Sequence, residues 1–397
     1  MKEQATFAPR STVETKIPRQ APLLEKSASI TVIGAGAFGG WTALFLLRNG
    51  FKVTLIDAWG AGNSRSSSGD ETRVTRSTYG ANEAYFDLNV RALELWKTHQ
   101  KLWNKSLFFN SGILWFCYEA HPPIIEDSLP FMQKHGLAYQ YIPLQEAKQR
   151  FPHIYVDDLH HLVFDPYGGY LKARESCQAV QEAFVKEGGT YLQAQVSPAT
   201  IKNERLENIR LSDGSIWQSH VFIFACGSWL GQIFPEVLGE VITCTKQEAY
   251  YFGVPASHAA LFDGMPVWVD LDGENFYYGI PANAARGFKI GVDKRGEIFD
   301  PTCSNRFLNQ EVFIKASQFI SHRFPALKNA PLVENRVCPY ENSPDGNFIL
   351  DTHPEAGNCW FLGGGTGHGF KHAPALGELA AQIISGQKPL HPLFQMR

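Results

Sequence analysis

Three glycines and one acidic residue near the N-terminus have the spacing of a phosphate-binding turn. Gly34, Gly36 and Gly39 follow the apolar run 30–33, and Asp57 ends a second apolar run eighteen residues after Gly39. Such glycines allow a tight turn, a close approach of the backbone to a pyrophosphate, and close packing of a helix on a strand. The N–H groups at the start of that helix stabilise phosphate, and the acid can accept hydrogen bonds from both hydroxyls of a ribose. The pattern therefore predicts a dinucleotide site, without separating FAD from NAD.

The segment that follows is small, polar and basic. Residues 60–76 include Ser66 and end in two arginines, Arg73 and Arg76, just before an amphipathic helix expected over 84–97. A loop of this composition suits a second phosphate or a flavin. The same composition also fits a solvated surface loop, and the residues alone leave both interpretations open.

A second glycine-rich turn lies close to the C-terminus. Residues 363–371 read GGGTGHGFK, include Gly367, Gly369 and Lys371, and lead into a helix expected over 373–385. This is again a junction of strand, glycines and helix. Two such junctions, far apart in the sequence, indicate one ligand that is held from both sides.

The elements that must position these residues alternate between strands and helices. Continuous apolar runs predict buried strands, and longer apolar or amphipathic runs predict helices. We expect strands at 30–33, 52–57, 190–196, 221–226, 348–351 and 360–362, helices at 38–49 and 175–187, and a hairpin at 206–218. This order predicts an α/β fold with a Rossmann-like dinucleotide-binding domain. Residues 240–300 alternate aromatic strands with turns, which predicts a second domain built on an antiparallel or mixed β-sheet, an added α+β lobe.

The composition argues against several classes of protein. The chain has 397 residues, of which 36 are basic and 39 acidic, so we expect neither nucleic acid nor a membrane as a partner. We expect no signal peptide and, without an apolar run of about 18 residues, no transmembrane helix, which favours a cytoplasmic protein. The seven cysteines are scattered and never spaced as CxxC, which argues against a disulfide framework and against a bound metal.

Six motifs, taken together, resemble one known family. They are GAGAFGG at 34–40, SSSGDETRVTR at 66–76, FACGSW at 224–229, FKIG at 288–291, RVCPY at 336–340 and GGGTGHGFKHAPALGE at 363–378. Over roughly residues 29–390 the chain resembles FAD-dependent amine oxidases of the D-amino-acid-oxidase superfamily, in particular the monomeric sarcosine oxidase and N-methyltryptophan oxidase branch. The resemblance implies FAD as cofactor. It also implies oxidation of the C–N bond of a secondary amine or amino acid, such as an N-methyl or cyclic amino acid, to an imine, with O2 reduced to H2O2.

The resemblance also implies how cofactor and substrate are held. Cys338 matches a cysteine that forms a thioether with the flavin, so the FAD would be covalently attached. Arg76 and Lys371 match the pair that holds the substrate carboxylate, for which a guanidinium and an ammonium group are chemically suited. Asp57 matches the acid on the adenosine ribose, and Val196 a residue that touches the adenine. The other implied cofactor contacts are Gly34, Gly36, Phe38, Gly39, Ser66, Arg73, Gly367, Gly369 and Lys371.

Three residues are implied in catalysis. Lys289 and Arg73 match basic residues beside the flavin ring, the lysine being implicated in oxygen activation, and Tyr340 matches a tyrosine of the substrate pocket. A fixed cation at Lys289 would stabilise the anionic reduced flavin. By itself, a lysine in a strand is more often solvated. Tyr277, Tyr278 and Tyr340 fit ordinary core packing as well as a pocket around the amine.

The chain departs from the family pattern at Asp293, where sarcosine oxidase carries a histidine. We hypothesise that Asp293, if it faces the pocket, favours an amine with an additional positive charge or a polar side chain. The arginine-containing loop is also one residue longer, and the N-terminal segment is additional. These departures leave the flavin chemistry unchanged and concern the choice of substrate.

The predicted protein is one bilobed enzyme. We assign residues 29–110, 155–238 and 330–397 to a discontinuous FAD-binding domain, 111–154 and 239–329 to the substrate domain, and 1–28 to a flexible N-terminal arm. The expected partners are a small-molecule amine or amino acid and O2, bound by a monomer or a homodimer. The alternatives are a dehydrogenase that passes electrons to a quinone or carrier protein, a non-catalytic flavoprotein subunit, and, less well supported, an NAD-dependent enzyme.

Overall fold

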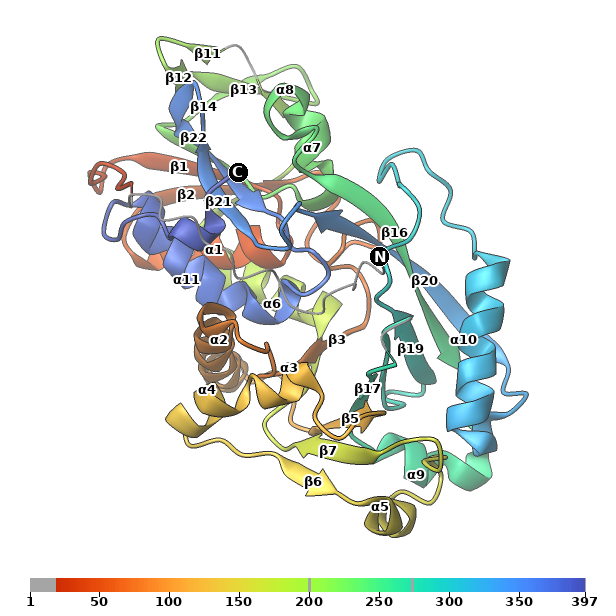
Figure 1. The fold of residues 1–397 in the computed structure, drawn as a ribbon. Helices are drawn as coiled ribbons and strands as arrows, with labels where there is room; N and C mark the ends of the chain where they lie inside the picture. The colour runs from red at the N-terminus through yellow and green to blue at the C-terminus, as the bar shows by residue number, and fades with distance from the viewer. Residues whose placement is uncertain (1–18, 199–200, 273–274, 397) are drawn as a thin grey trace.

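The computed structural model describes residues 19–198, 201–272 and 275–396, and two large β-sheets dominate it. One sheet has six strands and the other has eight. Figure 1 shows them side by side, the first with β1, β2 and β22 and the second with β16, β19 and β20. The expected architecture, a Rossmann-like domain with a second β-sheet lobe, is confirmed.

The six-stranded sheet has the order β21-β22-β15-β1-β2-β9. Its members are β1 (Ser29–Ile33), β2 (Lys52–Asp57), β9 (Thr190–Gln193), β15 (Val221–Phe224), β21 (Ile349–His353) and β22 (Ala356–Gly363). All neighbours pair in parallel except β21, which runs antiparallel at the edge. Parallel strands that are covered on both faces are uniformly apolar, which is why these runs could be recognised in the sequence.

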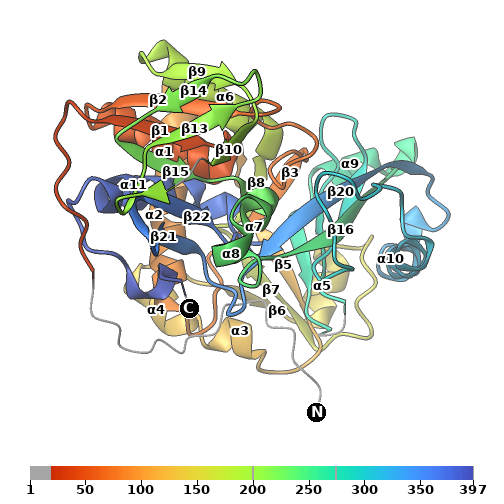
Figure 2. The same cartoon turned by 90° about the horizontal axis from the view of Figure 1, so that it is seen from above.

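Four helices pack near this sheet: α1 (Ala37–Arg48), α2 (Glu83–Leu102), α6 (Ala173–Lys186) and α11 (Ala373–Ile384). Figure 2 shows α1 and α11 close to β1 and β15. A Cβ at Gly377 of α11 would lie 2.7 Å from the Cβ of Trp41 in α1, so the glycine lets the two helices approach closely. Trp41 in turn meets Trp96 of α2 edge to face, with ring centroids 5.3 Å apart. The close approach at Gly377 and this aromatic contact together join α1, α2 and α11 in one core.

The eight-stranded sheet has the order β20-β16-β19-β18-β17-β5-β7-β6. Its members are β5 (Ile113–Cys117), β6 (Gln140–Ile142), β7 (His161–Asp165), β16 (Thr243–Phe252), β17 (Val267–Asp270), β18 (Tyr277–Ile280), β19 (Phe288–Val292) and β20 (Leu332–Asn342). Only β5 and β17 pair in parallel, so the sheet is mixed. Helix α10 (Gln310–Arg323) lies along its outer side (Figures 1 and 2) and buries Ala316 and Ile320 in the core of this lobe.

A small three-stranded sheet stands beside the large ones. It consists of β3 (Thr72–Thr75), β8 (Gly169–Lys172) and β4 (Phe108–Phe109). The remaining elements are short: β10 (Val196–Pro198), β11 (Ile201–Lys202), β12 (Arg205–Leu206), β13 (Asn208–Leu211), β14 (Ile216–Gln218), α3 (Pro123–Glu126), α4 (Leu129–Lys134), α5 (Leu144–Arg150), α7 (Leu230–Ile233), α8 (Pro235–Leu238), α9 (Ala259–Asp263), and 3₁₀ turns η1 (Gly227–Trp229), η2 (Ala256–His258), η3 (Pro325–Leu327), η4 (Phe370–His372) and η5 (Pro392–Phe394). The hairpin expected at 206–218 corresponds to β13 and β14.

Two parts of the chain are arranged differently from the predicted segments. Strands β7 and β20 hydrogen-bond within the eight-stranded sheet, although both lie in segments that we assigned to the FAD-binding domain. Strand partners are chosen over long sequence distances, so local patterns do not reveal them. Residues 19–28 of the arm are tied to the C-terminal segment: Gln20 Nε2 donates to Gly386 O at 2.9 Å and Leu24 N to Ser385 O at 3.2 Å. The rest of the arm, residues 1–18, lies outside the described residues.

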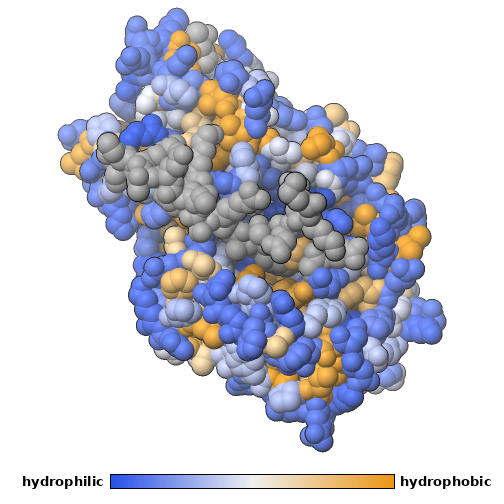
Figure 3. Space-filling model, in the orientation of Figure 1, coloured by the Kyte–Doolittle hydropathy of each residue, from blue (hydrophilic) through white to orange (hydrophobic). Residues whose placement is uncertain are grey.

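Among the coloured residues of Figure 3, hydrophobic side chains form separate groups on a mainly hydrophilic surface. Large exposed hydrophobic residues near α10 include Phe307 and Ile314. Across the residues that the structure describes, no helix combines the length and the apolar character needed to cross a membrane.

Candidate active site

A cavity of about 1020 Å³ runs from the carboxyl ends of the six-stranded sheet to the neighbouring face of the eight-stranded sheet. This is at the upper end of the range of about 300–1,000 Å³ for small-molecule sites. The cavity brings together most of the residues singled out in the sequence: Gly34, Gly36, Phe38, Asp57, Ser66, Arg73, Arg76, Val196, Asp293, Tyr340, Gly367, Gly369 and Lys371 all line it. Gly39, Lys289 and Cys338 are not among its lining residues.

The first glycine turn has the backbone geometry that its residues require. Gly34 has φ +106°, and a Cβ there would lie 2.3 Å from the carbonyl oxygen of Ala225 on the neighbouring strand. A Cβ at Gly39 would lie 2.0 Å from the oxygen of Gly34, so this glycine permits helix–strand contact and does not face the cavity. Any larger residue at either position would push α1 away from β1 and β15.

The start of α1 is suited to bind phosphate. Gly36 is the N-cap residue and offers no side chain to accept the N–H groups of the first turn, which contains no acidic residue. Ala37 N donates to Ser68 Oγ at 3.2 Å, which fixes the loop 60–71 against this turn. Because the positive end of the helix has no protein anion in its first turn, it favours the pyrophosphate of a dinucleotide.

Asp57 is bound to the backbone of the turn as well as lining the cavity. Its Oδ2 accepts from Ala35 N at 2.7 Å, and its Oδ1 accepts from Trp59 N and Gly60 N at 2.8 Å each. Burial raises the pKa of Asp57, and these N–H groups oppose the shift. A carboxylate has about four lone-pair positions. With three of them in use by backbone N–H groups, Asp57 Oδ2 keeps one position for a ribose hydroxyl, and the contact with the ribose stays a prediction.

The second glycine turn packs against residues of the first lobe and of β20. Gly367 has φ +77°, and a Cβ there would lie 2.3 Å from Cε2 of Tyr340. A Cβ at Gly369 would lie 2.6 Å from Cζ of Phe38 in α1. Gly369 and Phe38 therefore connect the two glycine-rich junctions physically, at the side of the cavity where both were expected to hold one ligand.

Residues 60–76 do not form a solvated surface loop. Ser68, Asp70 and Arg76 are buried, and the segment ends in strand β3. Asp70, which the sequence analysis missed, is its central residue. It accepts from Lys289 Nζ at 2.5 Å, from Arg73 Nη1 at 2.6 Å and from Tyr251 Oη at 2.6 Å.

Burial and the contacts within this cluster shift the pKa values of Asp70 and Lys289. Burial disfavours the ionised form of Asp70, but Lys289 and Arg73 outweigh it and hold the pKa of Asp70 well below its usual range. Burial also lowers the pKa of Lys289, whereas the negative charge of Asp70 opposes this shift. Lys289 is 1% exposed and also donates to Thr72 O at 2.9 Å. It therefore lies behind the cavity wall, in contact with Asp70, while Arg73 reaches the wall.

Cys338 lies next to the same arginine. Its Sγ accepts from Nη2 of Arg73 at 3.4 Å, and the side chain is buried. Burial raises the pKa of the Cys338 thiol, while the charge of Arg73 opposes the shift. The guanidinium is thus placed to stabilise a thiolate at the one cysteine for which a covalent role was expected.

Arg76 and Lys371 both line the cavity and lie beside the same aromatic ring. The guanidinium of Arg76 lies 4.5 Å from the ring centroid of Tyr79, and Lys371 Nζ lies 5.3 Å from the same centroid. Both residues are buried, and Arg76 also donates to the carbonyl oxygen of Thr78. Burial and the nearby charge of Arg76 lower the pKa of Lys371 strongly. A carboxylate bound between these two basic groups would raise the pKa of Lys371 and favour its charged form. The pair is therefore suited to an anionic group.

Asp293 faces the cavity beside this pair. Burial raises its pKa, whereas Arg295, Arg76 and Lys371 oppose the shift. Arg295, a second residue that we missed, lies 3.5 Å from Asp293 Oδ1, donates to Thr366 O at 3.0 Å and stacks 5.4 Å from the ring centroid of Tyr340. This end of the cavity therefore offers both hydrogen-bond donors and an acceptor.

The tyrosines of β18 divide between the two faces of the sheet. Tyr278 lines the cavity together with Tyr340. Tyr277 packs in the core with its ring centroid 4.6 Å from that of Phe319, so of the two interpretations left open by the sequence, core packing holds for this residue. Successive residues of a strand point to opposite faces, so only one of the two neighbours can reach the cavity.

Comparison with known proteins decides the family. The sequence model of the DAO family, described as FAD dependent oxidoreductase, matches residues 29–383. The chain belongs to this family.

Individual members of the DAO family match over nearly the whole chain. Monomeric sarcosine oxidase from Bacillus sp. (strain NS-129) is 25% identical over 367 residues, 92% of this chain and 94% of that protein. N-methyl-L-tryptophan oxidase from Yersinia pestis (strain Pestoides F) is 25% identical over 91% of this chain and 95% of its own length. The crystal structure of L-proline dehydrogenase from P. horikoshii has a TM-score of 0.79 and 22% identity, covering 91% of this chain and 94% of that one, which shows a shared fold.

Membership of the DAO family establishes an FAD-dependent oxidoreductase. The structure fits this cofactor, since the uncapped start of α1, Asp57 and the second glycine turn all line one cavity. The two residues that we missed could have been noticed in part. Asp70 is the acid inside the conspicuous motif SSSGDETRVTR, whereas nothing local marks Arg295.

Proposed function

We propose that this enzyme oxidises the C–N bond of a secondary amine or amino acid to an imine and reduces O2 to H2O2. The observation that carries the proposal is the pair Arg76 and Lys371, two buried basic side chains that line the same cavity as the first glycine turn. Curated relatives named monomeric sarcosine oxidase and N-methyl-L-tryptophan oxidase support an amino-acid type of substrate.

The residues of the chain bind and orient the substrate. Arg76 and Lys371 hold its carboxylate, which fixes the position of the neighbouring carbon–nitrogen bond. Tyr278 and Tyr340 line the cavity where the amine would lie, and their rings attract it while it is still protonated. FAD, when bound, would supply the two-electron chemistry, as acceptor of the hydride from the C–H beside the nitrogen and donor of two electrons to O2. The amine loses a hydride and a proton, and O2 gains two electrons and two protons.

An amine panel with a peroxide readout tests the proposal. We expect peroxide in air from N-methyl or cyclic amino acids and a loss of apparent affinity when the substrate carboxylate is replaced by a neutral group. A Lys371→Met variant should lose this preference for the carboxylate. Equal turnover of carboxylated and neutral amines by the wild type would contradict the assignment of the pair.

We further propose that the FAD is attached through Cys338. The guanidinium of Arg73 lies 3.4 Å from Cys338 Sγ and opposes the effect of burial on the thiol, which supports a thiolate that forms only in the folded protein. After denaturation in acid, flavin absorbance should stay with the wild-type polypeptide and move to the supernatant for Cys338→Ser. As a matched control, Cys359→Ser changes another buried cysteine and should keep the flavin attached. Free flavin from the wild type would show that Cys338 is only structural.

We propose that Asp293 contributes to the choice of substrate. It lines the cavity next to Arg295, so an additional positive charge on the amine could pair with Asp293, and a polar side chain could hydrogen-bond to either residue. Turnover of sarcosine, pipecolate, N-methyltryptophan and basic amino acids by wild type and Asp293→Asn tests this idea. Identical substrate preferences of the two proteins would exclude it.

One observation favours the alternative, a dehydrogenase that passes electrons to a quinone or carrier protein. The ammonium group of Lys289 contacts Asp70 and does not line the cavity, so its charge is partly neutralised. The two functions differ in peroxide yield per amine under air, which should be near one for the oxidase and small for the dehydrogenase. A cytoplasmic location and a monomeric or homodimeric state remain predictions from the sequence.

A further inference from the structure

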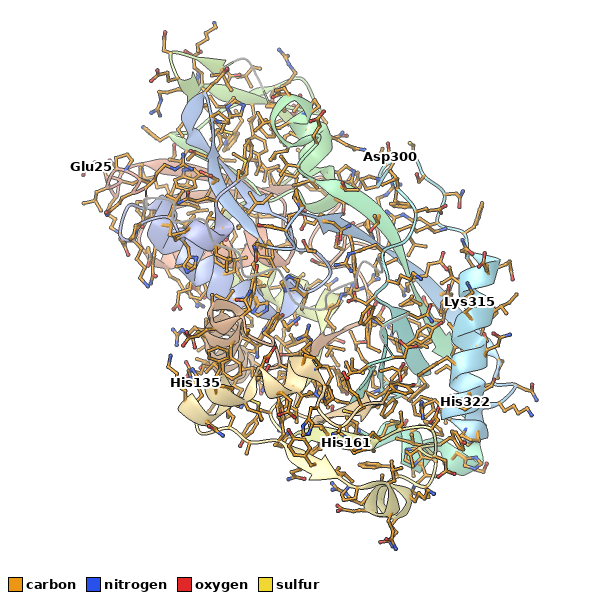
Figure 4. All side chains as sticks on the ribbon, in the orientation of Figure 1. Glu25, His135, His161, Asp300, Lys315 and His322 are labelled. Atoms are coloured by element: carbon orange, nitrogen blue, oxygen red, sulfur yellow. The ribbon has the colours of Figure 1, made fainter. Side chains whose placement is uncertain are left out.

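One acidic residue on the cavity wall has no role in the function proposed above. Glu341 follows Tyr340 on β20, lines the cavity and is 8% exposed. The titratable side chains labelled in Figure 4, among them His161 on β7 and Lys315 on α10, are by contrast not among the lining residues. Asp57 is expected at the ribose of the dinucleotide, but a further carboxylate near the pyrophosphate is unexpected, because the pyrophosphate carries negative charge.

The carboxyl group of Glu341 is only partly satisfied. The N–H groups of Gly364 and Gly365 in the second glycine turn act on it, and a Cβ at Gly365 would lie 3.0 Å from its Oε1. Oε2 is buried, and no hydrogen-bond partner for it exists among the residues that the structure describes. A Cβ at Gly363 would lie 3.3 Å from this oxygen and a Cβ at Gly227 3.9 Å from it. An unpaired buried oxygen costs free energy, so it points to a ligand that completes its hydrogen bonding.

The position of Oε2 is next to the dinucleotide turn. Gly227 directly follows Ala225 and Cys226, and Ala225 is the residue whose carbonyl oxygen lies against Gly34. The oxygen therefore stands between the two glycine-rich junctions, at the carboxyl ends of β15 and β22. Gly227 and Gly365, the glycines beside the carboxyl group of Glu341, also line the cavity.

Among the residues that the structure describes, no cation balances the charge of Glu341. The titratable groups that face it are two thiols, Cys226 at the end of β15 and Cys244 on β16, and the charge of Glu341 contributes to raising the pKa of both. Arg306 and Asp300 act on Cys244 with opposite signs. Neither the glycine turn 363–365 nor η1 presents a charged side chain to Glu341. Burial raises the pKa of Glu341 to about 7, although the N–H groups of Gly365 and Gly364 lower it.

We infer that Glu341 is a cofactor-binding residue that acts as a neutral acid, whose Oε2–H donates a hydrogen bond to an oxygen in the ribityl–pyrophosphate part of FAD. A neutral carboxyl group is a donor and does not repel the phosphates, whereas a carboxylate at this place would have no donor to offer. Binding of FAD therefore takes up a proton when Glu341 is ionised in the protein without flavin. By linkage, the dissociation constant of FAD rises towards about tenfold per pH unit once the pH exceeds the pKa of Glu341.

The test uses the full chain with Cys338→Ser, so that flavin can be removed and added back whether or not the wild type holds it covalently. FAD is titrated into this parent protein and binding is followed by the quenching of flavin fluorescence across the pH range from mildly acidic to mildly alkaline. Glu341→Gln is added as the test variant, since it keeps the shape and a donor but cannot ionise. Glu334→Gln is the matched control, because Glu334 is on the same strand, pairs with Arg336 at 2.7 Å and does not line the cavity.

We expect the parent and the Glu334→Gln protein to lose affinity for FAD towards alkaline pH, and the Glu341→Gln protein to bind with a constant affinity. If Glu341→Gln retains the slope of the parent, the inference is wrong. Calorimetry in buffers of different ionisation enthalpy gives a second measurement on the parent, which should take up close to one proton per FAD under alkaline conditions. Absence of proton uptake there would also overturn the inference, and this result does not depend on how Glu341→Gln folds.

Discussion

Replacing Asp70 by asparagine would show how strongly the charged cluster behind the cavity is held. Asn keeps the size of the side chain but removes the negative charge that faces Lys289 Nζ at 2.5 Å and Arg73 Nη1 at 2.6 Å. Both cations are largely buried, and breaking a buried pair by removing one partner costs about 3–5 kcal/mol, because a charge is left uncompensated. We therefore expect Asp70→Asn to lower the free energy of unfolding by about 3–5 kcal/mol near neutral pH.

The pH dependence of this loss has a definite sign. The pKa of Asp70 lies below its usual range in the folded protein, since Lys289 and Arg73 outweigh the effect of burial. Its contribution is therefore complete above its unfolded pKa of about 3.9 and is lost as the pH falls below that value. The difference between wild type and Asp70→Asn should shrink by about 1.4 kcal/mol per pH unit in this acidic range.

Urea unfolding followed by tryptophan fluorescence and circular dichroism measures the effect. Tyr251→Phe keeps the charge of Asp70 and removes one hydrogen bond to it, so it should cost about 1.5–3 kcal/mol. Glu182→Gln breaks an exposed pair with Lys105 and should change stability by less than about 1 kcal/mol. The reasoning is refuted if Asp70→Asn costs no more than Glu182→Gln, or if its cost does not fall under acidic conditions.

Three further predictions concern single residues. Gly367→Ala should lower the free energy of unfolding by about 2–5 kcal/mol, because Gly367 has a positive φ and a Cβ there would overlap with Tyr340. Gly357→Ala, where no atom lies within 4 Å of the added Cβ, should be nearly neutral, and urea unfolding compares the two variants. Lys371→Met should raise the KM for carboxylated amines by roughly tenfold or more and leave the KM for neutral amines unchanged, and an equal effect on both would contradict its place at the carboxylate. Asn309→Ala should cost about 1 kcal/mol in thermal unfolding, because Asn309 caps α10 by accepting from two backbone N–H groups.

The parts of the fold that follow from local patterns were predictable. The buried run 30–33, the glycine turn and the run 52–57 are adjacent in sequence, so strand, helix and strand could be placed within a residue or two. Helix α2 extends further than the expected 84–97, to Leu102, because its hydrophobic side keeps contact with α1 and α11. Such an extension depends on tertiary packing and leaves little trace in the local sequence.

The positions of site residues that belong to a motif and face the cavity could be predicted. The positions of residues that depend on contacts between distant segments could not. Lys289 was expected beside the flavin, but Asp70, 219 residues earlier in the chain, binds its ammonium group behind the wall. Tyr251, 181 residues from Asp70, completes the same cluster. No pattern within one segment reports a contact that forms only when the loop before β3 packs against β16 and β19 of the eight-stranded sheet.

The register of strand β20 limits which mutations this protein can accept near its cavity. Cys338, Tyr340 and Glu341 pair with Gln247, Thr245 and Cys244 of β16 in one continuous register. Cys338 and Tyr340 share one face of the strand and Glu341 lies on the other. Deleting or inserting one residue here would exchange the faces, moving the carboxyl group to the substrate side and the tyrosine to the phosphate side. Substrate preference can therefore evolve in β20 by substitution but not by changes in its length.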